Sequence, residues 1–335
     1  MKQKKGFKMA TFIIIAVLVG WLSVGVVQGK NEQARNDTSV DKIFQNIRNA
    51  NPVFEWHESI LTFENEGMIL VCSLTVPDTN RKSPIVLTLN GFGGDRNDLV
   101  IPGTGEPYFK RFSRLMAEQG IASLRLDFRG SGDSEGEYQM TTFSTQISDA
   151  RAAVGYICKN LRDQVDTRSL GIMGFSQGGI VGSVTAAKDN RVKSLVLWSP
   201  VASPPHCYQG LLTRAGILKG LALADGGYDI FGVYVDDQYV SWDLPLGKGF
   251  FEDIFNIDPV SEIRRYRNPL MVIVGKNDPI VFPQPAKGQL YLKYHEGPEK
   301  LVLVDTDHAF NYWAGPQKPD DTFFWSIAWF IKTLK

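Results

Sequence analysis

A serine between two glycines, at the junction of an apolar run and a helical pattern, is the feature that most limits how this chain can fold. Residues 174–178 read Gly-Phe-Ser-Gln-Gly, after the apolar run 169–173 and before the small-residue pattern 179–188. This arrangement predicts a nucleophile elbow, a sharp strand-to-helix turn with Ser176 at the bend. Glycines leave room for the strained turn, and the helix N-terminus favours negative charge there. The pentapeptide also occurs by chance, so its strand and helix context carries the prediction.

Apolar runs alternate with helical patterns on both sides of this turn. Strands are predicted at 53–63, 68–76, 85–89, 121–128, 169–173, 192–198, 270–275 and 300–304, and helices at 108–119, 142–161, 285–294 and 322–335. Continuous apolar strands between helices are typical of a mostly parallel sheet covered on both faces. The sequence therefore predicts an α/β fold.

The rhythm of strands and helices divides the chain into parts. It breaks between residues 202 and 267, where Gly, Tyr and Trp are frequent and periodicity is weak, which indicates a cap inserted after the sixth strand of the sheet. The catalytic domain then comprises 53–201 and 268–335, and residues 30–52 are interpreted as a linker.

The first residues have the composition of an export signal. Lys2, Lys4, Lys5 and Lys8 precede the uncharged segment 9–29, which is rich in Ile, Val and Leu. A basic region followed by an apolar one predicts a signal peptide at residues 1–29, and the segment is also about long enough for an uncleaved membrane anchor. Either interpretation predicts an exported protein, secreted or held at the membrane by this segment alone.

Charge and cysteine content exclude several other classes of protein. The 335 residues have a formal net charge of zero, so there is no basic excess of the kind that nucleic-acid binding needs. Three cysteines form no disulfide framework, and no pattern asks for a metal or a redox cofactor. We therefore expect neither nucleic acid nor cofactor, and the sequence indicates no oligomeric state.

A serine nucleophile needs a base, and one histidine is positioned for that role. Of the four histidines, only His308 follows a predicted strand directly, in the loop after 300–304. Active-site groups of open α/β sheets gather at the carboxyl ends of strands. His57, His206 and His295 lie in an early strand, in the cap and near a helix end. His308 is therefore the candidate base.

The acid that orients the base should follow an earlier strand. Asp278 comes directly after the strand 270–275. Asp305 and Asp307 are alternatives, but they are too close in sequence to His308 to reach behind its ring easily. The resulting order, serine then acid then histidine, is that of an α/β-hydrolase triad.

An acyl-transfer site also needs backbone donors for the oxyanion. One should be the N–H of Gln177, directly after the nucleophile. The other should come from the glycine-rich loop 90–94, where Phe92 is the candidate donor.

Together these pieces resemble an α/β-hydrolase, and the chain is similar to bacterial cinnamoyl and feruloyl esterases and their serine-aminopeptidase-like relatives. The resemblance covers residues 53–335 and rests on the segments 90–94, 127–134, 174–179, 277–279 and 307–310. The family usually has histidine where this chain has Asn90, which leaves the backbone donor role intact. The resemblance implies a cofactor-free serine hydrolase, with the segment 127–134 as structural support.

In this family the insertion forms a lid that shapes the acyl pocket. Aromatic residues of the cap could hold an aromatic acid, or they could simply form the core of the cap. The candidate substrate contacts are Trp198, His206, Tyr208, Tyr234 and Trp242, with Tyr228 and Tyr239 as further cap aromatics.

We therefore expect an exported serine hydrolase that cleaves carboxylic esters through an acyl-enzyme. Its substrate would be a small-molecule or carbohydrate-linked ester, with hydroxycinnamoyl esters as one candidate class. The alternatives are an aminopeptidase that anchors the substrate amine on Asp236, Asp237 or Asp243, an acyltransferase or perhydrolase with the same triad, and a non-catalytic binding module.

Overall fold

An eight-stranded sheet forms the centre of the protein. The computed structural model describes residues 38–334, so the expected leader at 1–29 lies outside the described residues. Strand order is β1-β2-β4-β3-β5-β6-β9-β10, with β2 antiparallel to β1 and β4 and the other neighbours parallel. The strands are β1 (Trp56–Asn65), β2 (Met68–Pro77), β3 (Ser83–Leu89), β4 (Ala122–Leu126), β5 (Val165–Phe175), β6 (Val192–Trp198), β9 (Leu270–Gly275) and β10 (Glu299–Val304).

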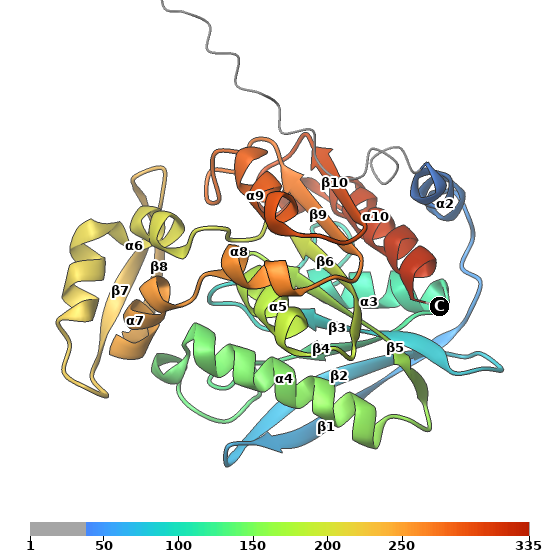
Figure 1. Ribbon diagram of the computed structural model, residues 1–335, viewed down its shortest axis with the longest axis horizontal. Helices are drawn as coiled ribbons and strands as arrows, with labels where there is room; N and C mark the ends of the chain where they lie inside the picture. Colours follow the sequence, from blue (N-terminus) through green and yellow to red (C-terminus); the bar gives the residue numbers. More distant parts are fainter. Residues whose placement is uncertain (1–37, 335) are drawn as a thin grey trace, which may run out of the picture. The chain divides into compact units, whose positions relative to one another are not determined.

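Helices cover both faces of this sheet (Figure 1). One face packs with α4 (Phe143–Asn160), α5 (Gln177–Lys188) and α9 (Ala286–Tyr294). The other packs with α3 (Tyr108–Glu118) and α10 (Gln317–Thr333). The strands between them are almost wholly buried, as expected for a sheet covered on both faces. The predicted α/β class with a mostly parallel sheet is confirmed.

Between β6 and β9 the chain leaves the sheet. It forms α6 (Pro204–Leu221), the two-stranded sheet of β7 (Tyr228–Val235) and β8 (Gln238–Gly247), and α7 (Lys248–Asn256). We call residues 204–256 the lid; it lies at the left of Figure 1. Apolar side chains of α6, β7, β8 and α7 share one core with Phe143 and Ile180 of the catalytic domain.

The end of the segment predicted as a cap belongs to the main body instead. Beyond the lid come α8 (Pro259–Glu262) and the short η2 (Ile263–Arg265). Val260, Ile263 and Tyr266 are buried in the core on the α5 face of the sheet. The end of the cap expected at residue 267 is therefore too late. The sequence of this stretch has no clear periodicity, so the pattern alone assigns it to the insertion.

The expected linker, residues 30–52, contains a helix. Helix α2 (Ser39–Arg48) buries Val40, Phe44 and Ile47, and the ring of Phe44 stacks on Trp325 of α10 at 4.1 Å between centroids. The interpretation of this stretch as a linker is wrong over α2. The spacing of the three apolar residues on one helix face was a usable signal.

None of the helices within residues 38–334 is long and apolar enough to span a bilayer.

Candidate active site

The turn from β5 into α5 has the strained geometry that the serine motif predicts. Ser176 has φ 55° and ψ −114°, a conformation rarely adopted by a non-glycine residue. A Cβ atom on Gly174 would come within 2.2 Å of the Gly178 carbonyl oxygen, and one on Gly178 within 2.3 Å of the Leu89 carbonyl oxygen. Only glycine fits at either position, which explains both glycines of the motif.

The structure brings Ser176, His308 and Asp278 into one hydrogen-bonded line. His308 Nε2 lies 2.9 Å from Ser176 Oγ, and His308 Nδ1 lies 2.8 Å from Asp278 Oδ2. Because an ionised carboxylate only accepts, Nδ1 carries the proton and Nε2 is free to accept from the serine hydroxyl. All three residues are buried, at 5–8% exposed. The arrangement can abstract the serine proton and stabilise the resulting imidazolium.

Asp278 is held in place by the backbone that follows it. Its Oδ1 accepts hydrogen bonds from the N–H groups of Ile280 and Val281, at 2.8 and 2.9 Å. Its Oδ2 is thereby left for His308. This local turn fixes the carboxylate orientation without the help of distant residues.

The two competing acids have other partners. Asp305 accepts from the side chain of Asn277 at 3.0 Å. Asp307 accepts from the N–H groups of Ala309 and Asn311 and from the indole of Trp313, at 3.0, 2.7 and 2.7 Å. Asp307 thus shapes the loop that carries the histidine and leaves its ring to Asp278.

The backbone of His308 has a second support that the sequence did not suggest. Ser199, directly after β6, donates its hydroxyl to the carbonyl of His308 at 3.0 Å. The two residues are 109 positions apart, so no local pattern could have revealed this contact.

The predicted oxyanion loop lies beside the serine. A Cβ atom on Gly91 would be 3.3 Å from the Ser176 Cβ. Among the described residues, the backbone N–H groups of Phe92 and Gln177 have no protein acceptor, and the latter is an unpaired donor in the first turn of α5. The side chain of Asn90, which replaces the family's histidine, donates to the Gly94 carbonyl and so braces the loop from within.

Aromatic and amide side chains hold Gly93, which follows one donor, and Gln177, which carries the other. The Gly93 N–H donates to the Tyr138 hydroxyl at 2.9 Å. The Tyr208 hydroxyl donates to Gln177 Oε1, and Gln177 Nε2 donates to Gln146 Oε1. Burial raises the pKa of the Tyr208 hydroxyl far above its ordinary value, so it remains a donor. Neither Tyr138 nor Gln146 belongs to a motif that sequence reasoning could single out.

Two of the expected substrate contacts are core residues. Trp198 is fully buried among the helices of the α10 face, and its indole donates to Ser326 Oγ at 2.8 Å. Tyr208 is fully buried in the core shared with the lid. Neither ring offers a surface to a substrate, because other side chains cover both. Those side chains belong to elements that are distant in sequence.

The other expected contacts are partly or well exposed. His206 packs against Phe282 at 5.2 Å between centroids, and burial together with the nearby Lys287 lowers its pKa. Tyr234 packs on Tyr239 within the β-hairpin.

The buried ring of Tyr208 contacts the oxyanion loop, at 5.4 Å from the ring of Phe92 between centroids. Trp242 is the exposed member of the expected substrate contacts that also touches this loop. Its ring centroid lies 5.9 Å from that of Phe92. The indole ring also lies against Gly93, where an added Cβ atom would clash with it.

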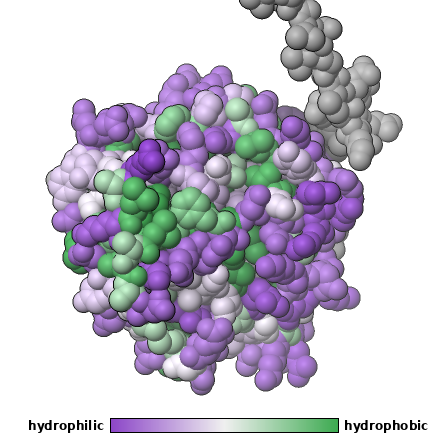
Figure 2. All heavy atoms as spheres, turned by 60° about the vertical axis from the view of Figure 1, so that its left-hand side comes forward, coloured by the Kyte–Doolittle hydropathy of each residue, from purple (hydrophilic) through white to green (hydrophobic). Residues whose placement is uncertain are grey.

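The lid exposes apolar side chains. Figure 2, which brings the lid forward, shows hydrophobic residues gathered among hydrophilic ones on this side of the molecule. The exposed large apolar residues of the lid are Leu218, Tyr228, Ile230, Tyr239, Val240, Trp242 and Phe255.

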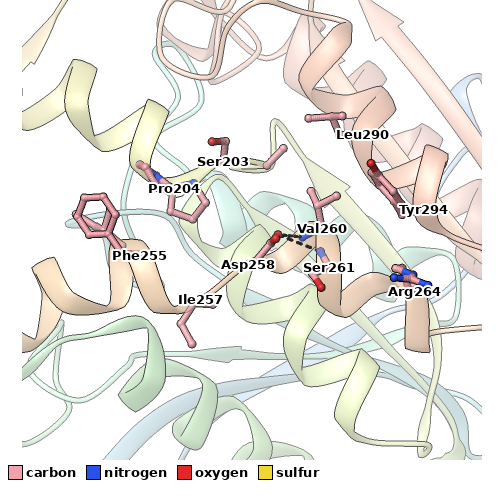
Figure 3. A pocket seen from close by; sticks show the side chains of 13 residues that line it. Ser203, Pro204, Phe255, Ile257, Asp258, Val260, Ser261, Arg264, Leu290 and Tyr294 are labelled. Carbon is pink, nitrogen blue, oxygen red and sulfur yellow. Dashed lines mark hydrogen bonds between the residues drawn. The ribbon is translucent and has the colours of Figure 1, made fainter.

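A hollow of about 550 Å³ lies at the base of the lid (Figure 3). It is bordered by the start of α6, by the connection from α7 to α8 and by α9, and its wall combines apolar side chains with Ser203, Ser261 and Arg264. Asp258 accepts from the backbone of Val260 and Ser261 at its floor. No triad residue borders this hollow, so it is distinct from the acyl pocket expected near Ser176.

Within residues 38–334, no group of three or more His, Cys, Asp or Glu side chains could hold a metal ion.

Comparisons with known proteins found several similar sequences and structures. The family model of the X-Pro dipeptidyl-peptidases (S15 family) matches residues 66–230. An uncharacterized 31.7 kDa protein of Escherichia coli, from the traX-finO intergenic region, is 24% identical over 81% of this chain and 97% of its own length. The quorum-quenching protein AidA of Acinetobacter baumannii is 31% identical over 51% of this chain and 53% of its own length.

Among solved structures, Est1E from Butyrivibrio proteoclasticus with bound ferulic acid is similar, with a TM-score of 0.61 and 22% identity. The likeness covers 81% of this chain and 98% of Est1E. The chain therefore has the α/β-hydrolase fold, and the matches indicate an enzyme of the hydrolase type.

Proposed function

Since the chain has the α/β-hydrolase fold, we propose that it is an exported serine hydrolase that cleaves carboxylic esters through an acyl-enzyme. The observation that carries this proposal is the line of hydrogen bonds from Asp278 through His308 to Ser176. The unpaired N–H groups of Phe92 and Gln177 beside the serine support it, since a tetrahedral oxyanion needs such donors.

The chemistry follows from the tautomer of His308. Ser176 Oγ attacks the acyl carbon as its proton passes to His308 Nε2, and the carbonyl oxygen becomes an oxyanion held by the two N–H groups. Collapse of this intermediate breaks the ester bond, and His308 gives the proton to the leaving alcohol. Water, deprotonated by His308, then releases the acid and restores Ser176. Asp278 stabilises the imidazolium in both steps.

For the acyl group we propose a small aromatic acid, with hydroxycinnamates as the leading class. Phe92 and Trp242 support this choice, since they carry exposed or partly exposed aromatic rings at the oxyanion loop. The likeness to Est1E, which binds ferulic acid, points the same way. We also propose that residues 1–29 export the protein, on the strength of the basic and apolar pattern in the sequence.

A peptidase that removes N-terminal residues is the second candidate, and the match to the X-Pro dipeptidyl-peptidases favours it. Such an enzyme needs a carboxylate facing the site to bind the substrate amine. Asp243 accepts the hydrogen bond of the Tyr239 hydroxyl at 2.9 Å, which places this carboxylate against a neighbour in its own hairpin. This placement favours the esterase.

Turnover of matched substrates separates these candidates. Wild type and Ser176→Ala are assayed on p-nitrophenyl acetate and butyrate, methyl hydroxycinnamates and aminoacyl anilides. Ser183→Ala, within α5, is the buried-serine control. We expect ester turnover to fall by several orders of magnitude in Ser176→Ala alone. Faster turnover of anilides than of all esters would favour the peptidase, and equal activity of Ser176→Ala and wild type would refute both.

A further inference from the structure

A tyrosine outside the catalytic motifs fixes the loop that carries one of the expected oxyanion donors. Tyr138 lies in the short helix η1 (Tyr138–Met140), between β4 and α4. Its hydroxyl accepts the hydrogen bond of the Gly93 N–H at 2.9 Å. Gly93 directly follows Phe92, so the peptide fixed by this bond joins the expected donor residue to its neighbour.

This hydrogen bond is partly shielded from water, which makes its loss costly. Burial raises the pKa of the Tyr138 hydroxyl, with a smaller opposing effect of the Gly93 N–H, so the group stays neutral. A backbone N–H left without an acceptor where water has little access is destabilising. The loop would therefore be expected to move so that Gly93 finds another partner.

Apolar contacts hold the same loop from the lid side without fixing the orientation of its peptides. The ring of Phe92 lies 5.4 to 5.9 Å from the rings of Tyr208, Trp242 and Phe250, measured between centroids. Such contacts are non-directional. Within residues 38–334, the Tyr138 hydroxyl is the acceptor of the Gly93 N–H.

We propose that Tyr138 is a positioning residue for the oxyanion hole. By fixing the Gly93 N–H, its hydroxyl restricts the ψ angle of Phe92 and keeps the Phe92 N–H directed at the site where the oxyanion forms. Tyr138 acts through the loop and does not contact the reacting atoms. The inference rests on the proposed esterase chemistry and adds a residue from outside the triad and its motifs.

The test compares Tyr138→Phe with Tyr156→Phe, which removes a tyrosine hydroxyl from α4, where the ring stacks on Phe63 away from the loop. Steady-state kinetics are measured on p-nitrophenyl butyrate, with the active fraction counted from the acyl-enzyme burst, so that unfolded protein does not lower the apparent kcat. A second measurement is the affinity for an aryl boronic acid, whose tetrahedral adduct with Ser176 places an oxygen in the oxyanion hole.

We expect Tyr138→Phe to lower kcat about 10- to 100-fold, somewhat less than complete loss of one oxyanion donor, with KM changed less than about threefold. Boronic acid affinity should fall in parallel with kcat, while Tyr156→Phe stays close to wild type in both. If Tyr138 only stabilised the fold, Tyr138→Phe would lower the melting temperature and leave kcat per active site unchanged.

The outcomes separate this inference from the proposed function. If wild-type turnover depends on Ser176 and Tyr138→Phe matches Tyr156→Phe in kcat and boronic acid affinity, the inference alone is overturned. If wild-type turnover does not depend on Ser176, the proposed function fails and the inference fails with it.

Discussion

The indole ring of Trp242 lies so close to Gly93 that a Cβ atom there would come within 2.0 Å of the ring. Gly93 also has φ +73°, a backbone conformation that favours glycine. The lid and the oxyanion loop thus fit together only with glycine at this position. Any side chain at residue 93 must displace either Trp242 or the loop.

We therefore expect Gly93→Ala to lower kcat/KM for aryl esters by at least about tenfold, since a small misplacement of catalytic groups can cost about 100-fold. Gly67→Ala is the matched control, because Gly67 has φ +78° but open space around it. The double variant Gly93→Ala/Trp242→Ala should regain part of the loss by removing the clash. Equal activity of Gly93→Ala and Gly67→Ala would show that the contact with Trp242 does not matter.

Replacing Asp278 or Asp305 by asparagine tests which of the two carboxylates orients His308. Asp278→Asn removes the carboxylate that accepts from His308 Nδ1, and an amide nitrogen there would favour the wrong tautomer. We expect kcat to fall about 10³- to 10⁴-fold, with KM little changed, in steady-state kinetics on an aryl ester.

Asp305→Asn should retain most of the activity, because Asp305 contacts Asn277 and not the imidazole. A loss as large as that of Asp278→Asn would mean that the acid has been misassigned. Circular dichroism of both variants establishes that they are folded.

The local parts of the site were predictable because each lies within a few residues of a strand end. The loop 90–94, the serine turn at 174–178, Asp278 and His308 follow β3, β5, β9 and β10, and parallel strands bring their carboxyl ends to one edge. The strand-and-helix alternation likewise indicated the layered fold.

Contacts between distant segments were not predictable from the sequence. Trp198 and Tyr208 looked like substrate contacts, but packing with α10 and with the lid core buries them. Tyr138 and Ser199 have no motif, and their roles arise from single hydrogen bonds to Gly93 and His308. A single sequence does not show which aromatic side chain is exposed to solvent and which packs against another helix.

A buried ion pair supports the loop that carries the oxyanion donor. Arg96 and Asp127 are 3% and 0% exposed, and the guanidinium of Arg96 contacts the Asp127 carboxylate directly. The backbone N–H of Arg96 also donates to Asp127, at 2.7 Å. We expect Arg96→Met to lower the free energy of unfolding by about 3–5 kcal/mol, because it leaves the carboxylate buried without its cation.

Urea unfolding measures this effect. Arg96→Met/Asp127→Asn should cost less than the sum of the single changes, since the double variant buries no isolated charge. Arg168→Met is the control, because the side chain is 90% exposed and its pair with Asp166 should contribute at most about 1 kcal/mol. Additive losses in the double variant would contradict the proposed pairing.

Acid should weaken the contacts that Glu106 makes with α3. Burial opposes ionisation of this carboxyl, but hydrogen bonds from Arg114 and Arg111 outweigh it and lower the pKa below the ordinary 4.5. A group whose pKa is lower in the folded state stabilises the fold above its unfolded pKa and loses that contribution as the pH falls through its folded pKa. Glu106→Gln should therefore lower the free energy of unfolding at pH 7 by about 1–2 kcal/mol, and the difference from wild type should shrink below about pH 4.5. Urea unfolding from pH 3 to pH 7 tests this, with Glu55→Gln as the control at an exposed glutamate. If the difference in unfolding free energy between wild type and Glu106→Gln stays constant over that range, ionisation of Glu106 is not its cause.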